Sequence, residues 1–181
     1  ASPNKVIYGY LPYWNRRTAT FPTVLTHVSY FSLGIQADGR LLDIPKKNQE
    51  PGYRGYQNGA IQTIKKDLQM GQKIELTLTM MDQAAIPVFL RSEIARSQFI
   101  TDLKQIIETD PIDGINIDIE YNGLVDETLQ ANLTALLKET QRVLREHSPP
   151  LSLSIATYSD AGDLQRVTNL ASLSPYVDYV I

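Results

Sequence analysis

The residues with the clearest potential for chemistry lie at 113–120, where acidic and amide side chains alternate with isoleucines. If this segment is a β-strand, successive side chains point to opposite faces. Asn116, Asp118 and Glu120 then share one face, and three isoleucines share the other. Such polar groups are costly to bury unless they are paired or hydrogen-bonded. Two carboxyl groups and an amide directed to one place are typical of a site for acid–base catalysis.

The same alternation also fits a solvent-facing stripe on an amphipathic edge strand, which would have no chemical role. The segments on either side of residues 113–120 bear on this choice, because they define the sheet in which the strand would lie. Apolar runs bounded by turn residues predict six strands, at 5–11, 27–35, 73–81, 113–120, 151–158 and 176–181.

Helical patterns fill the long connections between these strands. Helices are predicted at 60–70, after an N-cap at Ser92, after an N-cap at Asp126, and over a short segment at 163–171. Residues 43–59 contain two prolines and three glycines and are predicted to form a loop. The Asp38-Gly39 dipeptide is a turn signal and predicts a short hairpin arm at 40–42.

The alternation of strands and helices predicts an α/β fold with a parallel sheet. An open doubly wound sheet would usually carry a Gly-rich phosphate loop after its first strand, and residues 8–12 do not form one. Polar residues that point inward at the C-terminal end of a strand suit a (β/α)8 TIM barrel, whose active sites lie on that rim. The barrel is therefore favoured over the open sheet.

The length of 181 residues is short for this architecture, because such barrels run to about 250 residues. We expect residues 1–181 to be the N-terminal part of a single barrel, with about the first five to six βα units, truncated within the sixth strand. The remainder of the barrel, in a longer chain or as a separate chain, is then an expected partner. We expect the isolated fragment to be inactive.

Composition excludes several classes of partner. The net charge of −3 provides no basic patch for nucleic acid or anionic lipid. No apolar run approaches the roughly 20 residues that a membrane-spanning helix needs. The chain has no cysteine and two scattered histidines, so neither thiolate chemistry nor a histidine metal site is expected. We expect no nucleic acid, membrane, metal or cofactor to be involved.

Residues 113–120 resemble the DGxDxDxE signature of family 18 glycoside hydrolases, which include chitinases and endo-β-N-acetylglucosaminidases. Residues 9–14 resemble the first-strand GYxxxW motif, and residues 26–32 are similar to the second strand of the family. Residues 176–181 resemble the segment that leads to the sixth-strand MxYD motif. The resemblance covers the whole chain and makes the solvent-facing stripe the weaker explanation. The resemblance is closer to bacterial members than to animal chitinases, and it implies an extracellular or cell-wall-associated, secreted protein.

The resemblance implies a retaining hydrolase of β-1,4-linked N-acetylglucosamine polymers, in which the substrate's own acetamido group is the nucleophile. Glu120 would be the acid/base, Asp118 would hydrogen-bond the acetamido N–H, and Asn116 would support them. Five further side chains are candidates for binding the sugar, although packing in the core or at the rim explains them as well. These are Tyr10, Trp14, Phe31, Met80 and Tyr158.

The sequence departs from the family pattern in three places. Asn116 stands where Asp is commoner, residues 79–81 replace a usual Gly-Gly pair, and the sixth-strand Tyr is absent. The second hypothesis is a catalytically silent, lectin-like barrel of the same superfamily, although Asp118 and Glu120 are both retained. A third is an unrelated (β/α)8 enzyme without preference for N-acetylated sugars. Chitin, peptidoglycan and an N-glycan core all stay open as the natural polymer.

Overall fold

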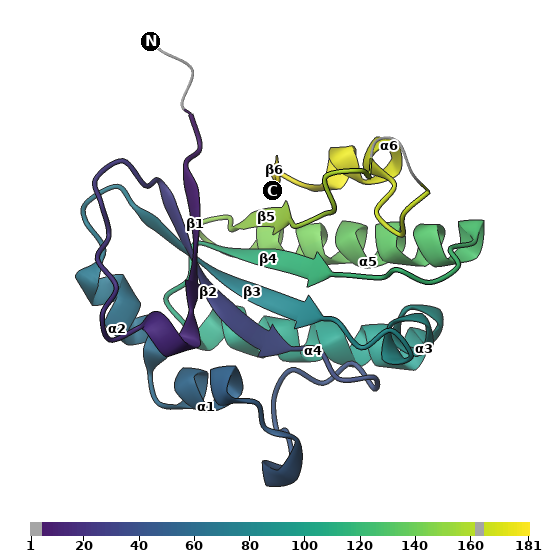
Figure 1. Cartoon of the computed structure of the whole chain (residues 1–181), viewed down its shortest axis with the longest axis horizontal. Helices are drawn as coiled ribbons and strands as arrows, with labels where there is room; N and C mark the ends of the chain where they lie inside the picture. Colours follow the sequence, from purple (N-terminus) through teal and green to yellow (C-terminus); the bar gives the residue numbers. More distant parts are fainter. Residues whose placement is uncertain (1–4, 162–164) are drawn as a thin grey trace.

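A single curved sheet of six parallel strands organises the molecule (Figure 1). The computed structural model describes residues 5–161 and 165–181. The strands pair in sequence order, each with its neighbours along the chain, as in the first part of a TIM barrel. The fold is therefore a half-barrel, which confirms the predicted class. The strands are β1 (Tyr8–Pro12), β2 (His27–Gly34), β3 (Lys73–Met80), β4 (Gly114–Ile119), β5 (Ser152–Ile155) and β6 (Tyr179–Val180).

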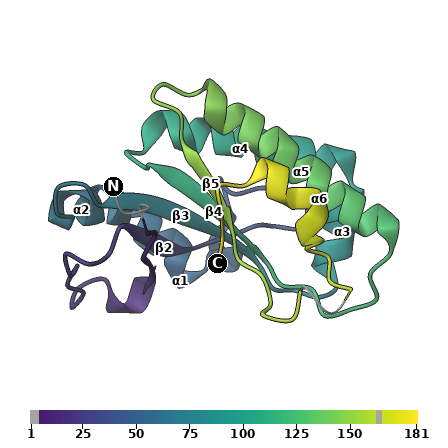
Figure 2. The same cartoon turned by 90° about the horizontal axis from the view of Figure 1, so that it is seen from above.

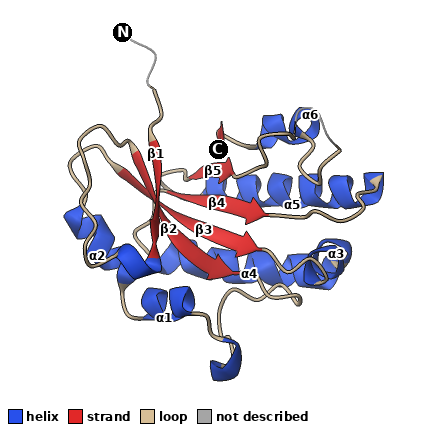
Figure 3. Ribbon diagram, in the orientation of Figure 1, coloured by secondary structure: helices blue, strands red, loops and turns tan. Residues whose placement is uncertain are grey.

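Helices connect the strands and cover one face of the sheet (Figure 3). The two longest, α4 and α5, run side by side along that face and contact each other (Figure 2). Among the described residues, no helix is both long and apolar enough to span a bilayer. The helices are α1 (Pro51–Gln57), α2 (Ala60–Asp67), α3 (Ala85–Arg91), α4 (Glu93–Thr109), α5 (Glu127–Glu146) and α6 (Leu170–Leu173).

Both predicted N-caps begin the long helices as expected. The Ser92 hydroxyl accepts the Ala95 N–H at 3.1 Å, and the Asp126 carboxylate accepts the Leu129 N–H at 2.7 Å. Each bond satisfies one of the main-chain donors that a helix start leaves without an intrahelical partner. The short helix predicted at 163–171 differs: α6 begins at Leu170, and residues 163 and 164 of the predicted segment lie outside the described residues.

The predicted hairpin arm at 40–42 is wrong, although the turn before it is present. The Gln36 N–H donates to the Arg40 carbonyl at 3.0 Å and closes the turn. Residues 40–42 then leave β2 and form no strand. Their main-chain donors must therefore find partners outside a sheet.

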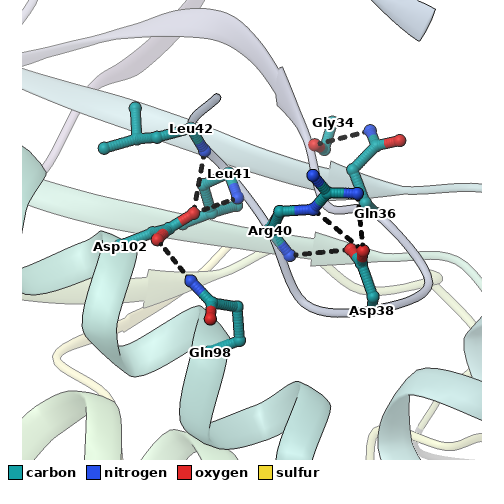
Figure 4. A network of polar contacts seen from close by, with 8 residues as sticks. All are labelled: Gly34, Gln36, Asp38, Arg40, Leu41, Leu42, Gln98 and Asp102. Atoms are coloured by element: carbon teal, nitrogen blue, oxygen red, sulfur yellow. Dashed lines mark hydrogen bonds and ion pairs between the residues drawn. The ribbon is translucent and has the colours of Figure 1, made fainter. Parts of the chain in front are cut away.

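The Arg40 N–H donates to the Asp38 carboxylate, and the partners of Leu41 and Leu42 come from α4, which the loop crosses (Figure 4). The Asp102 carboxylate accepts the N–H groups of Leu41 and Leu42 at 2.7 and 2.9 Å. Gln98, one turn earlier on α4, donates to the other carboxylate oxygen at 2.7 Å. A side chain from a distant helix thus replaces the partner strand that a hairpin would have supplied.

The predicted loop at 43–59 is wrong in part, because it contains α1. Gly52 lets this helix approach β2 closely: a Cβ there would lie 2.3 Å from the Ser32 carbonyl oxygen. The Tyr30 hydroxyl also donates to the Gly52 carbonyl at 2.8 Å. Glycine in this segment therefore serves close packing, although in sequence it indicates a loop.

The two faces of the sheet differ in chemistry. The isoleucines of β4 are buried in the apolar core with side chains of the covering helices. The opposite face carries a row of polar side chains, including Ser29 and Thr77, whose hydroxyl groups lie 2.6 Å apart. Because the sheet curves, this polar face lines the inside of the half-barrel.

Candidate active site

Strand β4 points the side chains of Asn116 and Asp118 to the inner face of the sheet, where both are buried. Asn116 is fully buried and Asp118 is 6% exposed, whereas Glu120, one residue beyond β4, is half-buried. Main-chain bonds fix the strand end: the Glu120 N–H donates to the Met80 carbonyl at 3.1 Å. The Gln83 side chain donates to the Glu120 carbonyl at 2.6 Å. The three residues thus run from the interior to the mouth of the half-barrel.

Asn116 connects strands that are far apart in the sheet. Its Nδ2 donates to Ser154 Oγ of β5 at 2.8 Å, and its Oδ1 accepts from the Tyr10 hydroxyl of β1 at 3.3 Å. Contact between side chains of β1 and β4 requires that the sheet curl around them. The amide is therefore held from both sides, in one orientation.

Asp118 has an electrostatic environment suited to chemistry. Burial raises the pKa of its carboxyl group from 3.8 to about 6, and the neighbouring Glu120 carboxylate adds to this effect. Within residues 5–161 and 165–181, no side-chain hydrogen bond to Asp118 is present. A buried carboxyl group without donors is costly, and a ligand N–H would relieve that cost.

Tyr10 lies near Asp118, and Phe31 packs against Tyr10. The Tyr10 ring is 39% exposed and meets the Phe31 ring edge-on, with centroids 6.0 Å apart. Burial and the Asp118 carboxylate raise the pKa of Tyr10 to about 12, so its hydroxyl keeps its proton near neutral pH. Trp14 lies farther along, on the 3-10 turn Tyr13–Asn15, and is 63% exposed.

Met80 and Phe31 also line a cavity of about 400 Å³ at the rim between β2 and β3. Met80 is itself nearly buried and belongs to the apolar core. Asp118 and Glu120 do not line this cavity, so it extends the rim beside the acidic pair. Two carboxylates, Glu50 and Asp82, are among its lining residues.

Tyr158 follows β5 on the same rim. The Arg166 guanidinium lies over its ring, 4.6 Å from the centroid. Burial raises the pKa of Tyr158, and the Glu120 carboxylate contributes. Its hydroxyl is buried and has no hydrogen-bond partner among the described residues. The Asn122 side chain lowers the pKa of Tyr158 in turn, so this hydroxyl is enclosed by neighbouring side chains at the rim.

Sequence analysis missed a second buried acid, Glu75 of β3. It is fully buried, and burial raises the pKa of its carboxyl group. It shares the inward face with Thr77, two residues later. The alternation that singled out Asn116 and Asp118 would also have identified Glu75, since it is the one charged residue inside an otherwise uncharged strand interior.

The site therefore offers a carboxyl group at the mouth, a second buried carboxyl group next to it, and hydroxyl groups and aromatic rings around them. Among the described residues, no group of three His, Cys, Asp or Glu side chains could hold a metal ion. This arrangement can donate and accept protons and can bind a polar ligand that has apolar faces.

Comparisons with known proteins agree with the fold and show the family. The family model for glycosyl hydrolases family 18 matches residues 6–181. A search of curated proteins returned no match. Among solved structures, the Group IV chitinase of Ostrinia furnacalis, in complex with allosamidin, has a TM-score of 0.71 and 21% identity. The match covers 97% of this chain and 50% of that one.

Two further structures show the same fold. A double mutant of a family 18 chitinase from Cycas revoluta, in complex with (GlcNAc)4, has a TM-score of 0.70 and 16% identity over 96% of this chain and 53% of that one. The spore cortex-lytic enzyme of Bacillus cereus has a TM-score of 0.65 and 18% identity over 96% and 40%. The chain thus spans about half the length of the structures that it matches or less.

Proposed function

Because the chain belongs to glycosyl hydrolases family 18, we propose that the natural protein containing it cleaves β-1,4-linked N-acetylglucosamine polysaccharides of the chitin or peptidoglycan type. The observation that carries this proposal is the pairing of Glu120, at the mouth, with Asp118, whose buried carboxyl group has no side-chain donor among the described residues. A neutral sugar with an acetamido N–H supplies the missing donor. The allosamidin and (GlcNAc)4 complexes of similar structures support a ligand of this class.

The proposed reaction divides the two carboxyl groups by position. Glu120 donates a proton to the glycosidic oxygen as the bond from that oxygen to C1 breaks. The acetamido oxygen of the same sugar attacks C1 from the opposite face and forms an oxazolinium ion. Asp118 accepts the N–H of this ion and offsets its positive charge. Glu120 then takes a proton from water, which attacks C1, restores the acetamido group and leaves the product with retained configuration.

The surrounding side chains would bind the sugar. The exposed rings of Tyr10 and Trp14 suit stacking against pyranose faces, and the Tyr158 hydroxyl suits a hydrogen bond near Glu120. Phe31 and Met80 would shape the rim between β2 and β3. Because the substrate polymers lie outside the cell membrane, we also propose an extracellular or cell-wall-associated protein. The remainder of the barrel would complete the cleft, so that residues 1–181 alone would be inactive.

The experiment compares Glu120→Gln with the wild type, both in the natural protein, on chitotetraose and on peptidoglycan. We expect hydrolysis to fall by about 10²–10⁴-fold while the affinity for the oligosaccharide is kept, because the amide cannot donate a catalytic proton. Glu108→Gln, an exposed change on α4, is the matched control and should leave both unchanged. Binding without any hydrolysis by the wild type would instead identify a lectin-like barrel.

A further inference from the structure

The buried acid Glu75 lies at the centre of a hydroxyl cluster inside the half-barrel. Its Oε2 accepts from the Tyr8 and Ser154 hydroxyls, and its Oε1 accepts from the Ser152 hydroxyl, each at 2.7 Å. Gly114 leaves room for this cluster: a Cβ there would lie 2.9 Å from Glu75 Oε1 and 2.1 Å from Ser152 Oγ. Three short hydrogen bonds to one fully buried carboxyl group fix the position of its side chain.

One of the three hydroxyls, that of Ser154, connects Glu75 to Asn116 of β4. Ser154 has a single proton, and it goes to Glu75 Oε2 at 2.7 Å and not to the more distant Tyr8 hydroxyl at 3.5 Å. The Ser154 oxygen must then accept from Asn116, so the amide presents Nδ2 to Ser154 at 2.8 Å. The amide oxygen consequently faces Tyr10 and accepts the only proton of its hydroxyl. A proton on Glu75 Oε1 would leave this direction unchanged, because Ser154 contacts Oε2.

We propose that Glu75 is a positioning residue, which acts through Ser154 to fix the orientation of the Asn116 amide and so directs the Tyr10 proton away from Asp118. If the amide were reversed, its N–H groups would face Tyr10. The Tyr10 hydroxyl, on which the Asp118 carboxylate acts electrostatically, would then be free to donate its proton to Asp118. That bond would stabilise the Asp118 carboxylate and occupy the acceptor that the proposed reaction offers to the acetamido N–H. Glu75 thus keeps Asp118 open to substrate.

Glu75, Ser154, Asn116 and Tyr10 form a relay of hydrogen bonds. The charged and titratable groups that face this relay come from several elements. Tyr10 of β1, Glu120 after β4 and Tyr158 after β5 act electrostatically with Asp118. Tyr8 of β1 and Asp178 before β6 act on Glu75. Ser152 bonds to neither Ser154 nor Asn116, so its contact with Glu75 lies outside the relay, whereas the Tyr8 hydroxyl also lies 3.5 Å from Ser154 Oγ.

The test follows the titration of the Asp118 carboxyl carbon by 13C NMR in the natural protein, without sugar. Its outcome is therefore separate from that of the hydrolysis assay on which the proposed role of Asp118 depends. We expect Ser154→Ala to lower the Asp118 pKa by about one unit, because the freed amide can reverse and release the Tyr10 proton. Ser152→Ala is the matched control: it also removes a serine hydroxyl from Glu75, but outside the relay, and should leave the pKa unchanged.

Two further variants identify the source of the effect. Glu75→Leu removes the acceptor and should lower the Asp118 pKa as Ser154→Ala does, whereas Glu75→Gln keeps an acceptor oxygen and should restore the wild-type value. In a Tyr10→Phe background, Ser154→Ala should cause no shift. An Asp118 pKa that is the same in Ser154→Ala and Ser152→Ala, whether unchanged or lowered in both, would overturn the proposal, even if Glu75→Leu does not fold.

Discussion

Two aspartates on opposite sides of the sheet are buried to nearly the same extent, yet their surroundings differ. Asp102, on the helical side, is 7% exposed and accepts three hydrogen bonds, two of them from main-chain N–H groups (Figure 4). Asp118, on the inner side, is 6% exposed and has no side-chain donor among the described residues. Burial alone therefore does not distinguish a carboxylate that stabilises the fold from one that is open to a ligand. The number of hydrogen-bond donors around each carboxylate distinguishes them.

This contrast has an energetic consequence. The donors at Asp102 satisfy the carboxylate and also satisfy a loop that has no partner strand, so the group stabilises the fold. Asp118 is kept in a position that disfavours its charge, and its pKa of about 6 records that cost. We expect substitutions at the two positions to have opposite effects on stability.

The largest expected effect on stability is at Asp102. Asp102→Ala leaves the N–H groups of Leu41 and Leu42 without partners and should lower the free energy of unfolding by about 4 kcal/mol. Urea unfolding of the natural protein measures this change. Affinity for chitotetraose should persist in the fraction that stays folded. A stability equal to that of the wild type would show that the loop does not depend on α4.

A smaller effect of opposite sign is expected at Asp118. Its pKa is raised from 3.8 to about 6 in the folded state, so the wild type loses stability as the pH rises through this interval. Asp118→Asn does not titrate and should be more stable than the wild type by up to about 3 kcal/mol at about pH 8. The difference should vanish at about pH 3, where Asp118 is protonated in both states. Urea unfolding at both pH values checks this, and a gain that does not depend on pH would contradict it.

The smallest effect is expected at Asp38, which forms an exposed ion pair with Arg40 near Asp102. Its side chain is 54% exposed, and the ion-pair distance is 2.8 Å. Asp38→Ala should lower the free energy of unfolding by less than about 1 kcal/mol, because solvent screens exposed pairs. Unfolding at low and high salt measures it. A loss comparable to that of Asp102→Ala would show that proximity to the loop, and not burial of the donors, sets the stability.

Much of the fold follows from local patterns in the sequence. Alternation at 113–120 placed the isoleucines of β4 in the core, and Ser92 and Asp126 marked the starts of two helices, because each signal depends on neighbouring residues. The two predictions that were wrong, the hairpin arm at 40–42 and part of the loop at 43–59, depend on residues that are distant in the sequence. The close approach of β2 leaves room only for glycine at position 52 of α1, and Leu41 and Leu42 find their acceptor in Asp102 of a distant helix.

The candidate site likewise has one part that local sequence predicts and another that depends on distant residues. The order of Asn116, Asp118 and Glu120 along one face could be predicted from a single strand. The hydroxyl cluster around Glu75 brings together side chains of β1, β3 and β5, and only the curvature of the sheet makes them neighbours. Local alternation identifies which side chains point inward, but it does not identify their partners.

The most direct test of the acidic pair is the configuration of the first product, followed by 1H NMR during cleavage of chitotetraose by the natural protein. If Asp118 assists an acetamido nucleophile, the new reducing end should appear as the β-anomer, and the fully deacetylated tetramer should not be cleaved. An α-anomeric product, or equal cleavage of the deacetylated tetramer, would contradict the roles proposed for Asp118 and Glu120.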